Sequence, residues 1–378
     1  MNKKLISIGF VTLLFSVSLI NIIKPQREFS ENENRYLQKL PKSGISKIFS
    51  GKFSMDFEEY AADQFIGRDG WITLKTLAEL AILKKDNGRI YFGKDGTLFD
   101  ATETVDSDVL EDNAVYVKNF INKLRSKTPE LDASILLVPT ATEIYNEKLP
   151  RFAPVPDQQS AINRVSKIFD NDAILLDTID LLKSNKGKYL YYRTDHHWTT
   201  DAAYIVYCEW ARKVGLTPLS LNAFSVKNVS TAFYGTLYSK ANLVTLKPDT
   251  VKAYHFNDAV SVSADLGSGK TSNTLYFDEY LNKKDKYSYF LGSNRPLIEI
   301  ETGTKNGYNL LLIQDSYAHC FVPFLTQHFE KISVVDLRYL TIDLYEYAIK
   351  NDITDVLVLY NLPGFATEKT ISRLEWEN

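Results

Sequence analysis

Short, mostly apolar segments recur along the chain and alternate with stretches whose apolar residues are spaced as in a helix. The apolar segments are 134–138, 174–177, 310–313, 332–336 and 356–360. Runs of this length are typical of buried parallel strands. Helical patterns at 157–169, 199–213, 317–329 and 341–350 separate most of them. The alternation predicts an α/β fold with a mainly parallel sheet covered on both faces, in three layers.

Other textures flank this pattern. Apolar residues at helical spacing predict helices at 51–83 and 109–126, and a Gly/Asp turn at 93–96 predicts a hairpin over 89–99. Between about 218 and 300, Thr, Ser, Val, Tyr and Asn dominate. We interpret this stretch as a β-rich insertion at the edge of the sheet, where it could shape a substrate cleft.

An uncharged apolar run from Leu5 to Ile23 follows Lys3 and Lys4. A helix of that length rises about 28 Å, close to the thickness of one hydrocarbon core. The lysines favour a cytoplasmic N-terminus, which sends the rest of the chain outside. A cleaved signal peptide is the alternative, although residues 19–25 offer no small residues for cleavage; a buried core helix is the third interpretation.

We therefore expect a signal anchor at 1–24, an extended lead-in at 25–50 and one α/β domain at 51–378. The expected location is the cell membrane, with the domain outside the cytoplasm; secretion after signal cleavage is the alternative.

Charge and cysteine content remove several classes of protein. The net charge is -3, whereas a mainly electrostatic nucleic-acid binder needs a basic surplus. We expect no nucleic-acid partner. The two cysteines, Cys208 and Cys320, provide neither a disulfide framework nor a four-cysteine zinc site. Both fall on predicted helices as small buried side chains, and a disulfide between them is the alternative outside the cytoplasm.

Two of the five histidines are adjacent, in the run Asp195-His196-His197-Trp198. In an extended loop, residues i and i+2 project to the same side. Asp195 and His197 are then expected to face one cleft, with His196 pointing away. An Asp beside a His holds one imidazole tautomer and stabilises the ring when it takes a proton. The alternative role for Asp195 is to cap the helix that begins near residue 199.

A serine, Ser316, stands where the apolar run 310–313 turns into the next predicted helix. This position is the carboxyl edge of the sheet, where open α/β sheets bind ligands. Backbone N–H groups at the helix start could hold an oxyanion. Serine needs a base before it attacks, and His197 is the candidate base, oriented by Asp195. A plain helix cap is the alternative.

Asp195, His196 and His197 also allow a metal interpretation, because carboxylate and imidazole bind Zn²⁺. Adjacent histidines rarely converge on one ion, and no further group of candidate metal ligands stands out in the sequence. We expect no metal and no cofactor.

The run Thr194-Asp195-His196-His197-Trp198 with its flanks resembles the signature of the DHHW family of bacterial surface proteins, which is similar to the SGNH-hydrolase-like domain of alginate O-acetyltransferases. Further matching motifs fall in the same order along roughly 30–365: Glu33-Asn34-Arg35, Asp63 to Arg68, Phe92 to Gly96, Gly235 to Tyr238, Asp315-Ser316-Tyr317 and Asp336 to Tyr339.

The resemblance implies an SGNH-like fold in which Ser316 is the nucleophile, His197 the base and Asp195 its orienter. It implies auxiliary or substrate-binding roles for Arg338 and Tyr317, and His196 is a further auxiliary candidate. Trp198 is a candidate sugar platform or a buried ring. The sequence has Gln314-Asp315-Ser316 in place of Gly-Asp-Ser and lacks a Gly-X-Asn-Asp block. Thr140 and Asn361 are oxyanion candidates by position only.

Three functions follow as expectations. The first is O-acetylation of a cell-surface polysaccharide, with a membrane-bound O-acyltransferase partner as the source of the acyl group. The second is a carbohydrate acetylesterase that uses the same three residues with water. The third is a non-catalytic protein that binds or assembles polysaccharide.

Overall fold

The five apolar segments form five adjacent parallel strands. In the computed structural model, which describes residues 3–30, 35–241, 243, 245–258 and 260–376, they lie in the order β13-β12-β14-β5-β6. Their bounds are β5 (Asp132–Val138), β6 (Ile174–Leu175), β12 (Asn309–Gln314), β13 (Lys331–Val335) and β14 (Asp355–Asn361). The central strands are apolar because both their faces are buried; Leu311 and Leu312, on opposite faces of β12, have no exposed surface.

An antiparallel extension widens this sheet to eight strands. β11 (Leu297–Thr302) pairs with β13, β9 (Val262–Asp265) with β11, and β10 (Thr271–Ser272) with β9. A separate hairpin joins β7 (Phe224–Phe233) and β8 (Asp249–Phe256). The β-rich stretch expected at 218–300 therefore supplies edge strands to the sheet and this hairpin, and the sheet is mixed but mostly parallel.

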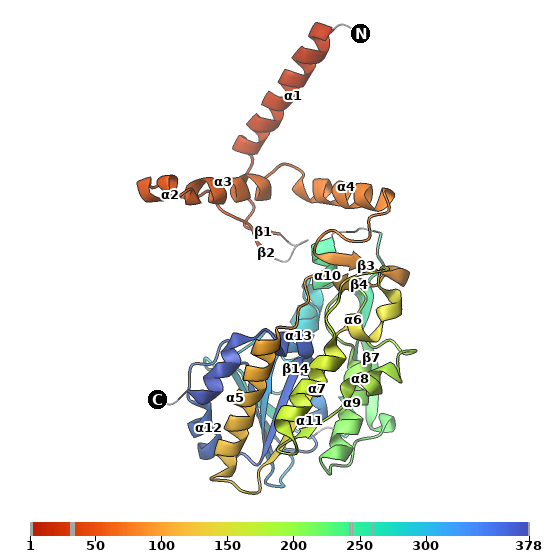
Figure 1. Ribbon diagram of the computed structural model, residues 1–378, viewed down its shortest axis with the longest axis vertical. Coiled ribbons are helices and arrows are strands. Elements are labelled where there is room, and N and C mark those ends of the chain that lie inside the picture. The colour runs from red at the N-terminus through yellow and green to blue at the C-terminus, as the bar shows by residue number, and fades with distance from the viewer. Residues whose placement is uncertain (1–2, 31–34, 242, 244, 259, 377–378) are drawn as a thin grey trace. The chain divides into compact units, whose positions relative to one another are not determined.

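Helices cover both faces of the sheet, as expected (Figure 1). On one face α12 (Leu344–Lys350) places Tyr347 against Ser333 of β13, and α5 (Ser107–Arg125) and α7 (Gln158–Phe169) pack beside it. On the other face α9 (Thr200–Lys213) places the buried Trp210, which donates a hydrogen bond to Ser134 of β5 at 2.9 Å. The register puts Ser333 and Ser134 on opposite faces, so the fold is a three-layer α/β sandwich.

The helix expected at 317–329 is wrong in detail. The segment is a 3-10 turn, η6 (Ser316–Cys320), followed by one short helix, α11 (Val322–Leu325). Pro323 has no N–H to donate to the carbonyl of His319, so a continuous α-helix cannot run through this segment.

Shorter elements complete the chain. The hairpin expected at 89–99 is formed by β3 (Ile90–Phe92) and β4 (Leu98–Asp100). The remaining short elements between residues 88 and 376 are η1 (Lys94–Gly96), α6 (Ala141–Ile144), η2 (Asn146–Lys148), α8 (Thr178–Lys183), η3 (Leu221–Ala223), α10 (Thr236–Ala241), η4 (Asp278–Asn282), η5 (Tyr287–Tyr289), α13 (Leu362–Phe365) and η7 (Lys369–Glu375).

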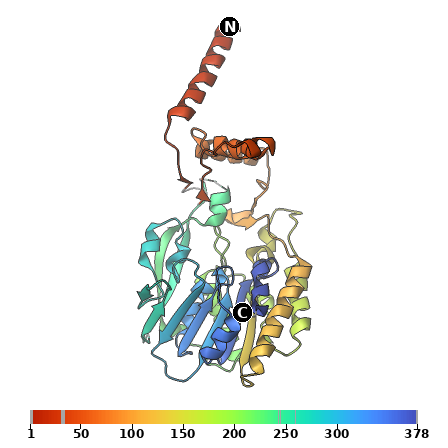
Figure 2. The ribbon, with the colours of Figure 1, turned by 90° about the vertical axis from the view of Figure 1, so that its left-hand side faces the viewer.

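The chain divides into two compact units, residues 1–87 with 238–246, and residues 88–237 with 247–378. Residues 51–87 thus group with the N-terminal unit by their contacts. That unit contains α1 (Lys3–Ile23), β1 (Phe29–Ser30), β2 (Arg35–Tyr36), α2 (Ile45–Phe49), α3 (Lys52–Asp63) and α4 (Arg68–Ala81), at the red to orange end of the ribbon (Figure 2). Glu33 and Asn34 lie outside the described residues.

Two sequence predictions bear on the N-terminal unit. Among the described residues, α1 is the one helix long and apolar enough to cross a membrane, as a signal anchor or a signal peptide would be. The single helix expected at 51–83 is instead two helices, because Gly67 adopts a left-handed conformation, with φ of 67°, just before α4.

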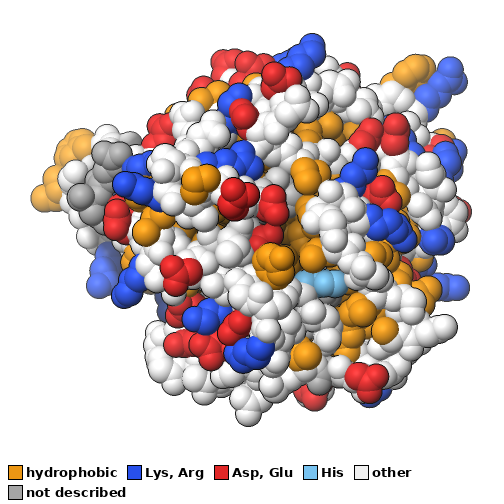
Figure 3. All heavy atoms as spheres, turned by 90° about the horizontal axis from the view of Figure 1, so that it is seen from below, with side chains coloured by type: hydrophobic (Ala, Val, Ile, Leu, Met, Phe, Trp, Pro, Cys, Tyr) orange, Lys and Arg blue, Asp and Glu red, His pale blue; other side chains and the backbone are white. Residues whose placement is uncertain are grey.

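On the face seen in Figure 3, acidic and basic side chains are interspersed and hydrophobic side chains lie between them. This face carries no broad field of one sign, which agrees with the small net charge of the chain.

Candidate active site

A closed loop between α8 and α9 presents the Asp195-His196-His197 run. Its two sides meet at a bridge between Tyr191 and Trp198, and the amide of Thr199 donates to the carbonyl of Leu190 at 2.8 Å. Inside the loop, Thr194 donates from its amide and its hydroxyl to the buried carboxylate of Asp249, at 2.8 and 2.6 Å. The first residue of β8 therefore holds this loop in place.

The carboxylate of Asp195 is buried and accepts hydrogen bonds from four groups. Its Oδ1 accepts from the amide and from Nδ1 of His197, at 3.0 and 2.5 Å. Its Oδ2 accepts from the amide and the hydroxyl of Thr236, at 2.8 and 3.1 Å. Burial by itself would raise the pKa of Asp195, but the His196 and His197 rings and these hydrogen bonds outweigh it and hold the pKa well below its usual range. The carboxylate is therefore ionised.

Gly235 makes room for this arrangement. A Cβ atom at position 235 would lie 2.2 Å from Cβ and 2.3 Å from Oδ2 of Asp195. No side chain fits there without displacing the carboxylate, which explains the Gly-Thr pair at the N-terminus of α10.

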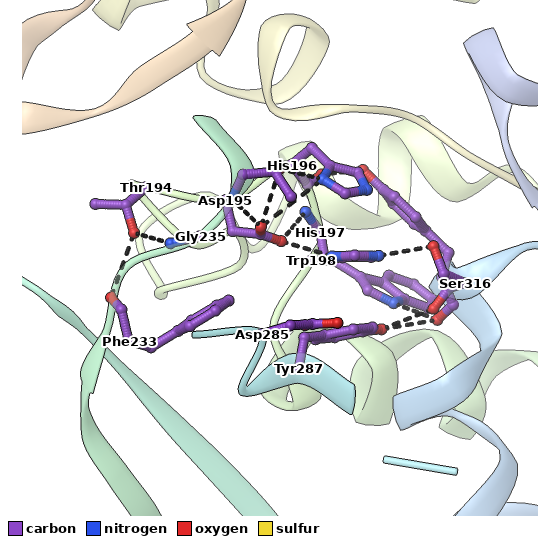
Figure 4. A network of polar contacts seen from close by, with 12 residues as sticks. Thr194, Asp195, His196, His197, Trp198, Phe233, Gly235, Asp285, Tyr287 and Ser316 are labelled. Carbon is purple, nitrogen blue, oxygen red and sulfur yellow. Dashed lines mark hydrogen bonds and ion pairs between the residues drawn. The ribbon is translucent and has the colours of Figure 1, made fainter. Parts of the chain in front are cut away.

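Ser316 lies at the carboxyl end of β12, on the first residue of η6, and is partly exposed. Its Oγ lies 2.8 Å from Nε2 of His197 (Figure 4). The structure thus brings together the three predicted residues Ser316, His197 and Asp195 in one chain of hydrogen bonds. The distances suit a nucleophile, a base and an orienting carboxylate.

This chain of contacts sets the tautomer of His197. Nδ1 faces a carboxylate, which only accepts, so Nδ1 carries the proton. Nε2 is then free to accept the proton of the Ser316 hydroxyl. A ring that takes this proton becomes a cation, and the ionised Asp195 stabilises it.

Tyr287 is a further part of the site that sequence reasoning missed. Its ring stacks on that of His197, with centroids 3.7 Å apart and planes inclined by 11°. Its hydroxyl donates to the carbonyl of Ser316 at 3.0 Å. Tyr287 thus contacts both the base and the nucleophile turn, and it comes from η5 in the β-rich stretch, where no local pattern marks it.

Asp315 shapes the turn that carries Ser316. Its carboxylate accepts from the amide of Tyr317 at 2.9 Å and from the amide and the side-chain Nδ2 of Asn361 at 2.9 and 2.5 Å. Burial raises the pKa of Asp315 to about 6, although these amides and the charge of Arg338 oppose the rise. All three contacts are donors, which suits an ionised carboxylate, so Asp315 acts as an anion above that pH.

The turn also limits which backbone groups can hold an oxyanion. The amide of Tyr317 is taken by Asp315. The amide of Ser316 makes no hydrogen bond with any part of the chain that the structure describes, and it belongs to the nucleophile residue itself. It is therefore the candidate donor to developing negative charge.

The expectation that His196 points away from His197 is wrong. The two ring centroids lie 3.8 Å apart, and Nδ1 of His196 lies 2.7 Å from the hydroxyl of Thr236. The loop bends at Asp195, whose side chain accepts from the amide two residues on, so the alternation of an extended strand does not apply.

Trp198 and Tyr317 are buried parts of the core. The indole of Trp198 has no exposed surface and donates to the carbonyl of Tyr317 at 2.8 Å, so it is not a sugar platform. The Tyr317 hydroxyl donates to the carbonyl of His196 at 2.5 Å. Both rings fasten the histidine loop to the nucleophile turn. Both cysteines are free, Cys320 buried and Cys208 half-buried.

Three further candidates lie at the carboxyl ends of the neighbouring strands. Asn361, at the end of β14, holds Asp315 as described above. Arg338, beyond β13, donates from Nε and an Nη to Asp336 at 2.9 and 2.6 Å. Thr140, beyond β5, is buried and bonded to Glu103 at 2.8 Å and to Gln158.

The only group of metal-ligating side chains found among the described residues is Asp195, His196 and His197. Both oxygens of Asp195 and the Nδ1 of each histidine already have hydrogen-bond partners. Because an ion would have to displace these bonds, the arrangement fits proton transfer better than metal binding.

Comparisons with known proteins place this chain in a family. A DHHW protein from Eubacterium siraeum superposes with a TM-score of 0.64 and 24% identity, over 74% of this chain and 92% of that one. Bacillus cereus PatB1, solved with a sulfonyl adduct, gives a TM-score of 0.63 and 22% identity, over 76% of this chain and 100% of that one. The O-acetyltransferase domain of Pseudomonas putida AlgJ gives 0.46 and 16%, over 75% and 98%.

None of the curated proteins matches this chain. The Eubacterium siraeum DHHW protein and Bacillus cereus PatB1 share the fold of this chain. The family model described as DHHW protein matches residues 106–335, which is more than half of the chain and includes Asp195, His197 and Ser316. The chain therefore belongs to the DHHW protein family.

Proposed function

We propose that the protein is an extracytoplasmic serine acyltransferase that O-acetylates a cell-surface polysaccharide. One observation carries the proposal, namely the hydrogen-bonded series from Ser316 Oγ through His197 to the buried Asp195. A decayed scaffold that only binds polysaccharide would have no need to keep a buried carboxylate ionised behind a histidine.

The first half of the reaction loads the acetyl group. Ser316 Oγ attacks the carbonyl carbon of the acyl donor while Nε2 of His197 takes the hydroxyl proton. The amide of Ser316 donates to the oxyanion. The tetrahedral intermediate collapses, the donor's leaving group departs with the proton from His197, and an acetyl ester remains on Ser316.

The second half of the reaction transfers the acetyl group from Ser316 to a sugar hydroxyl. His197 takes the proton of a sugar hydroxyl, whose oxygen attacks the ester carbonyl. The bond to Ser316 breaks, His197 returns a proton to Oγ, and the sugar leaves as its O-acetyl ester. With water in place of the sugar, the same steps release acetate, which is the esterase alternative; the partial exposure of Ser316 leaves a path for water.

The substrate class and the partner rest on the sequence resemblance to alginate O-acetyltransferase-like domains. With α1 as an uncleaved anchor, the catalytic unit stays at the outer face of the membrane. An acyl-exporting membrane-bound O-acyltransferase would supply the acetyl group there, because acetyl donors of the coenzyme A type are cytoplasmic.

The test uses the purified full chain, an activated acetyl ester as donor and oligosaccharides as acceptors. We expect the acetyl group on the oligosaccharide, detected by mass spectrometry, and no product with Ser316→Ala. Ser372→Ala, at a partly exposed serine that donates to the carbonyl of Lys369, is the matched control and should behave as wild type. Release of free acetate alone at every acceptor concentration would favour the esterase.

A serine-directed sulfonyl fluoride separates catalysis from mere binding. We expect one covalent adduct on the wild type and on Ser372→Ala, and none on Ser316→Ala. Labelling that is unchanged by Ser316→Ala would leave the polysaccharide-binding function as the better account.

A further inference from the structure

The N-terminal unit exposes large apolar side chains on two of its helices. On and just after α4, Trp71 is 57%, Leu74 55% and Ile82 77% exposed. On α2, Ile45 is 78% and Phe49 88% exposed. Large hydrophobic side chains that gather on the exposed side of helices mark surfaces that bind something apolar.

The apolar face of α4 is distinct from the face with which α4 packs within its unit. Trp71, Leu74 and Ala78 follow each other at three- and four-residue spacing and share one side of the helix. Thr76 lies on another side, is buried, and donates to the carbonyl of Ala241 at 3.3 Å. The stripe of Trp71, Leu74 and Ala78 therefore stays exposed although another side of α4 is packed within the unit.

This surface is attached to the point where α1 ends. The side-chain oxygen of Asn21, in the last turn of α1, accepts from the amide of Ile66 at 2.7 Å. Gln64 accepts from the amide of Arg27 at 3.0 Å and donates to its carbonyl at 2.9 Å. The corner between α3 and α4 is thus fastened to the exit of the apolar helix (Figure 1).

The end of a spanning helix lies at the boundary between acyl chains and head groups. Helices held at that level meet the interface, where tryptophan is the favoured aromatic residue.

The charges on α2 and in its flanking residues suit an anionic surface, whereas acidic side chains begin at Asp56 in α3. Residues 42–52 contain the exposed lysines Lys42, Lys47 and Lys52 and no acidic residue. Lys75 on α4 is also exposed. Lysines beside an exposed apolar face are typical of helices that lie in a membrane interface and contact anionic head groups.

We propose that α2 (45–49) and α4 with the two residues after it (68–83) form an interfacial collar that lies in the outer leaflet and binds anionic phospholipid. α1 alone would leave the unit tethered by one helix. The collar adds buried apolar area and head-group contacts, so it holds the N-terminal unit flat against the membrane. The inference rests on the proposed anchoring of α1, and the experiment distinguishes the two.

The test reconstitutes the full chain into protein-free vesicles of phosphatidylcholine, with or without phosphatidylglycerol, whose acyl chains carry bromine near the head group. Bromine quenches tryptophan within contact distance. We expect quenching of the wild type, more with phosphatidylglycerol, and loss of most of it in Trp71→Phe. Trp376→Phe removes another exposed tryptophan, outside the N-terminal unit, and should leave the quenching unchanged.

A second variant guards against a local effect of the Trp71 substitution. Leu74→Asp keeps Trp71 and adds a charge to the same stripe, so we expect reduced quenching of Trp71. Equal quenching in wild type, Trp71→Phe and Leu74→Asp would overturn the collar.

Alkaline carbonate extraction tests the anchor separately. A chain that resists extraction but shows no quenching of Trp71 contradicts the collar alone, whereas extraction of the wild type contradicts the anchor. If a photo-crosslinker at position 74 captures a membrane protein in cells and pure lipid gives no quenching, the surface binds a protein and the lipid proposal is wrong.

Discussion

At the scale of single residues, the site depends on one carboxylate whose every lone-pair direction is used. Asp195 joins the histidine loop to the start of α10 through His197 and Thr236. Each donor orients the carboxylate, and the carboxylate in turn orients His197 toward Ser316. Substitutions at this centre are therefore expected to act as a unit.

Ser316→Ala and His197→Ala should each reduce transferase turnover by roughly 10⁴-fold or more, and the double variant should lose little beyond either single change. His196→Ala should cost less, about tenfold, because the His196 ring supports the site from beside it, through Thr236 and by contact with the His197 ring, whereas His197 itself lies in hydrogen-bond contact with Ser316. Steady-state kinetics of the four proteins provides the measurement. An equal loss for His196→Ala would support the metal interpretation.

Gly235→Ala places a methyl group within 2.2 Å of Asp195. The carboxylate must then move away from Thr236 and His197, so turnover should fall sharply and the free energy of unfolding by roughly 2 kcal/mol or more. Gly187→Ala is the matched control, since nothing lies within 4 Å of its Cβ position. Denaturant unfolding measures the change in stability, and steady-state kinetics measures the change in turnover. If Gly235→Ala is as active as Gly187→Ala, the residues around Asp195 can move enough to accommodate the methyl group.

At the scale of elements, the 3-10 turn η6 carries more than the nucleophile. His319, three residues after Ser316, is buried and stacks on Tyr287 with centroids 6.3 Å apart. Burial above all, with the nearby His197 ring and the charge of Arg338, lowers the pKa of His319 to about 3. The unfolded chain titrates near the ordinary value of 6.5.

The sign of the pH effect follows from those two values. Between pH 3 and 6.5 the unfolded chain binds a proton at His319 that the native protein does not, so stability falls as the pH is lowered through this range, by up to about 1.4 kcal/mol per unit. His319→Phe should remove this dependence of the free energy of unfolding on pH between 3 and 6.5. Above pH 6.5 it should add no pH dependence. Denaturant unfolding at several pH values tests this.

The other buried groups in the same pH range do not cancel the comparison. His328, whose pKa burial lowers to about 4, and Asp315, whose pKa burial raises to about 6, are present in both proteins. The difference between wild type and His319→Phe therefore isolates His319. An identical slope in both proteins would contradict the proposed burial of a neutral imidazole.

At the scale of the whole molecule, the chain combines one apolar helix, a lysine-bearing helical unit and an α/β unit that holds the complete hydrogen-bonded site. All site contacts described above join residues of the second unit, 88–237 with 247–378. The chemistry therefore requires no residue of the anchor, whose expected role is location.

We expect the mature protein to retain α1. Residues 19–25 offer no small residues for signal cleavage, so intact mass measured on protein from membranes should correspond to a chain that still contains residues 3–23. Added protease should reach the α/β unit only from the outer face of the membrane. A mature chain that begins beyond residue 24 would show a cleaved signal peptide instead.

The sequence alone determined the layers of this protein. Strands buried on both faces must be apolar throughout, so the five parallel strands stand out as apolar runs, and a segment long enough to span a bilayer is visible by its length. The residue types at positions 195, 197 and 316 also predicted that an aspartate, a histidine and a serine act together. The family signature strengthened that hypothesis.

Only the tertiary structure decided how those residues meet. Thr236 and Gly235 around Asp195, Tyr287 on the ring of His197, and the burial of Trp198 are contacts between segments far apart in the chain. No local periodicity encodes them, because each depends on which elements the fold places beside one another. The direction of His196 was mispredicted for the same reason, since the hydrogen bonds of Asp195 bend the loop out of the extended geometry that its spacing suggested.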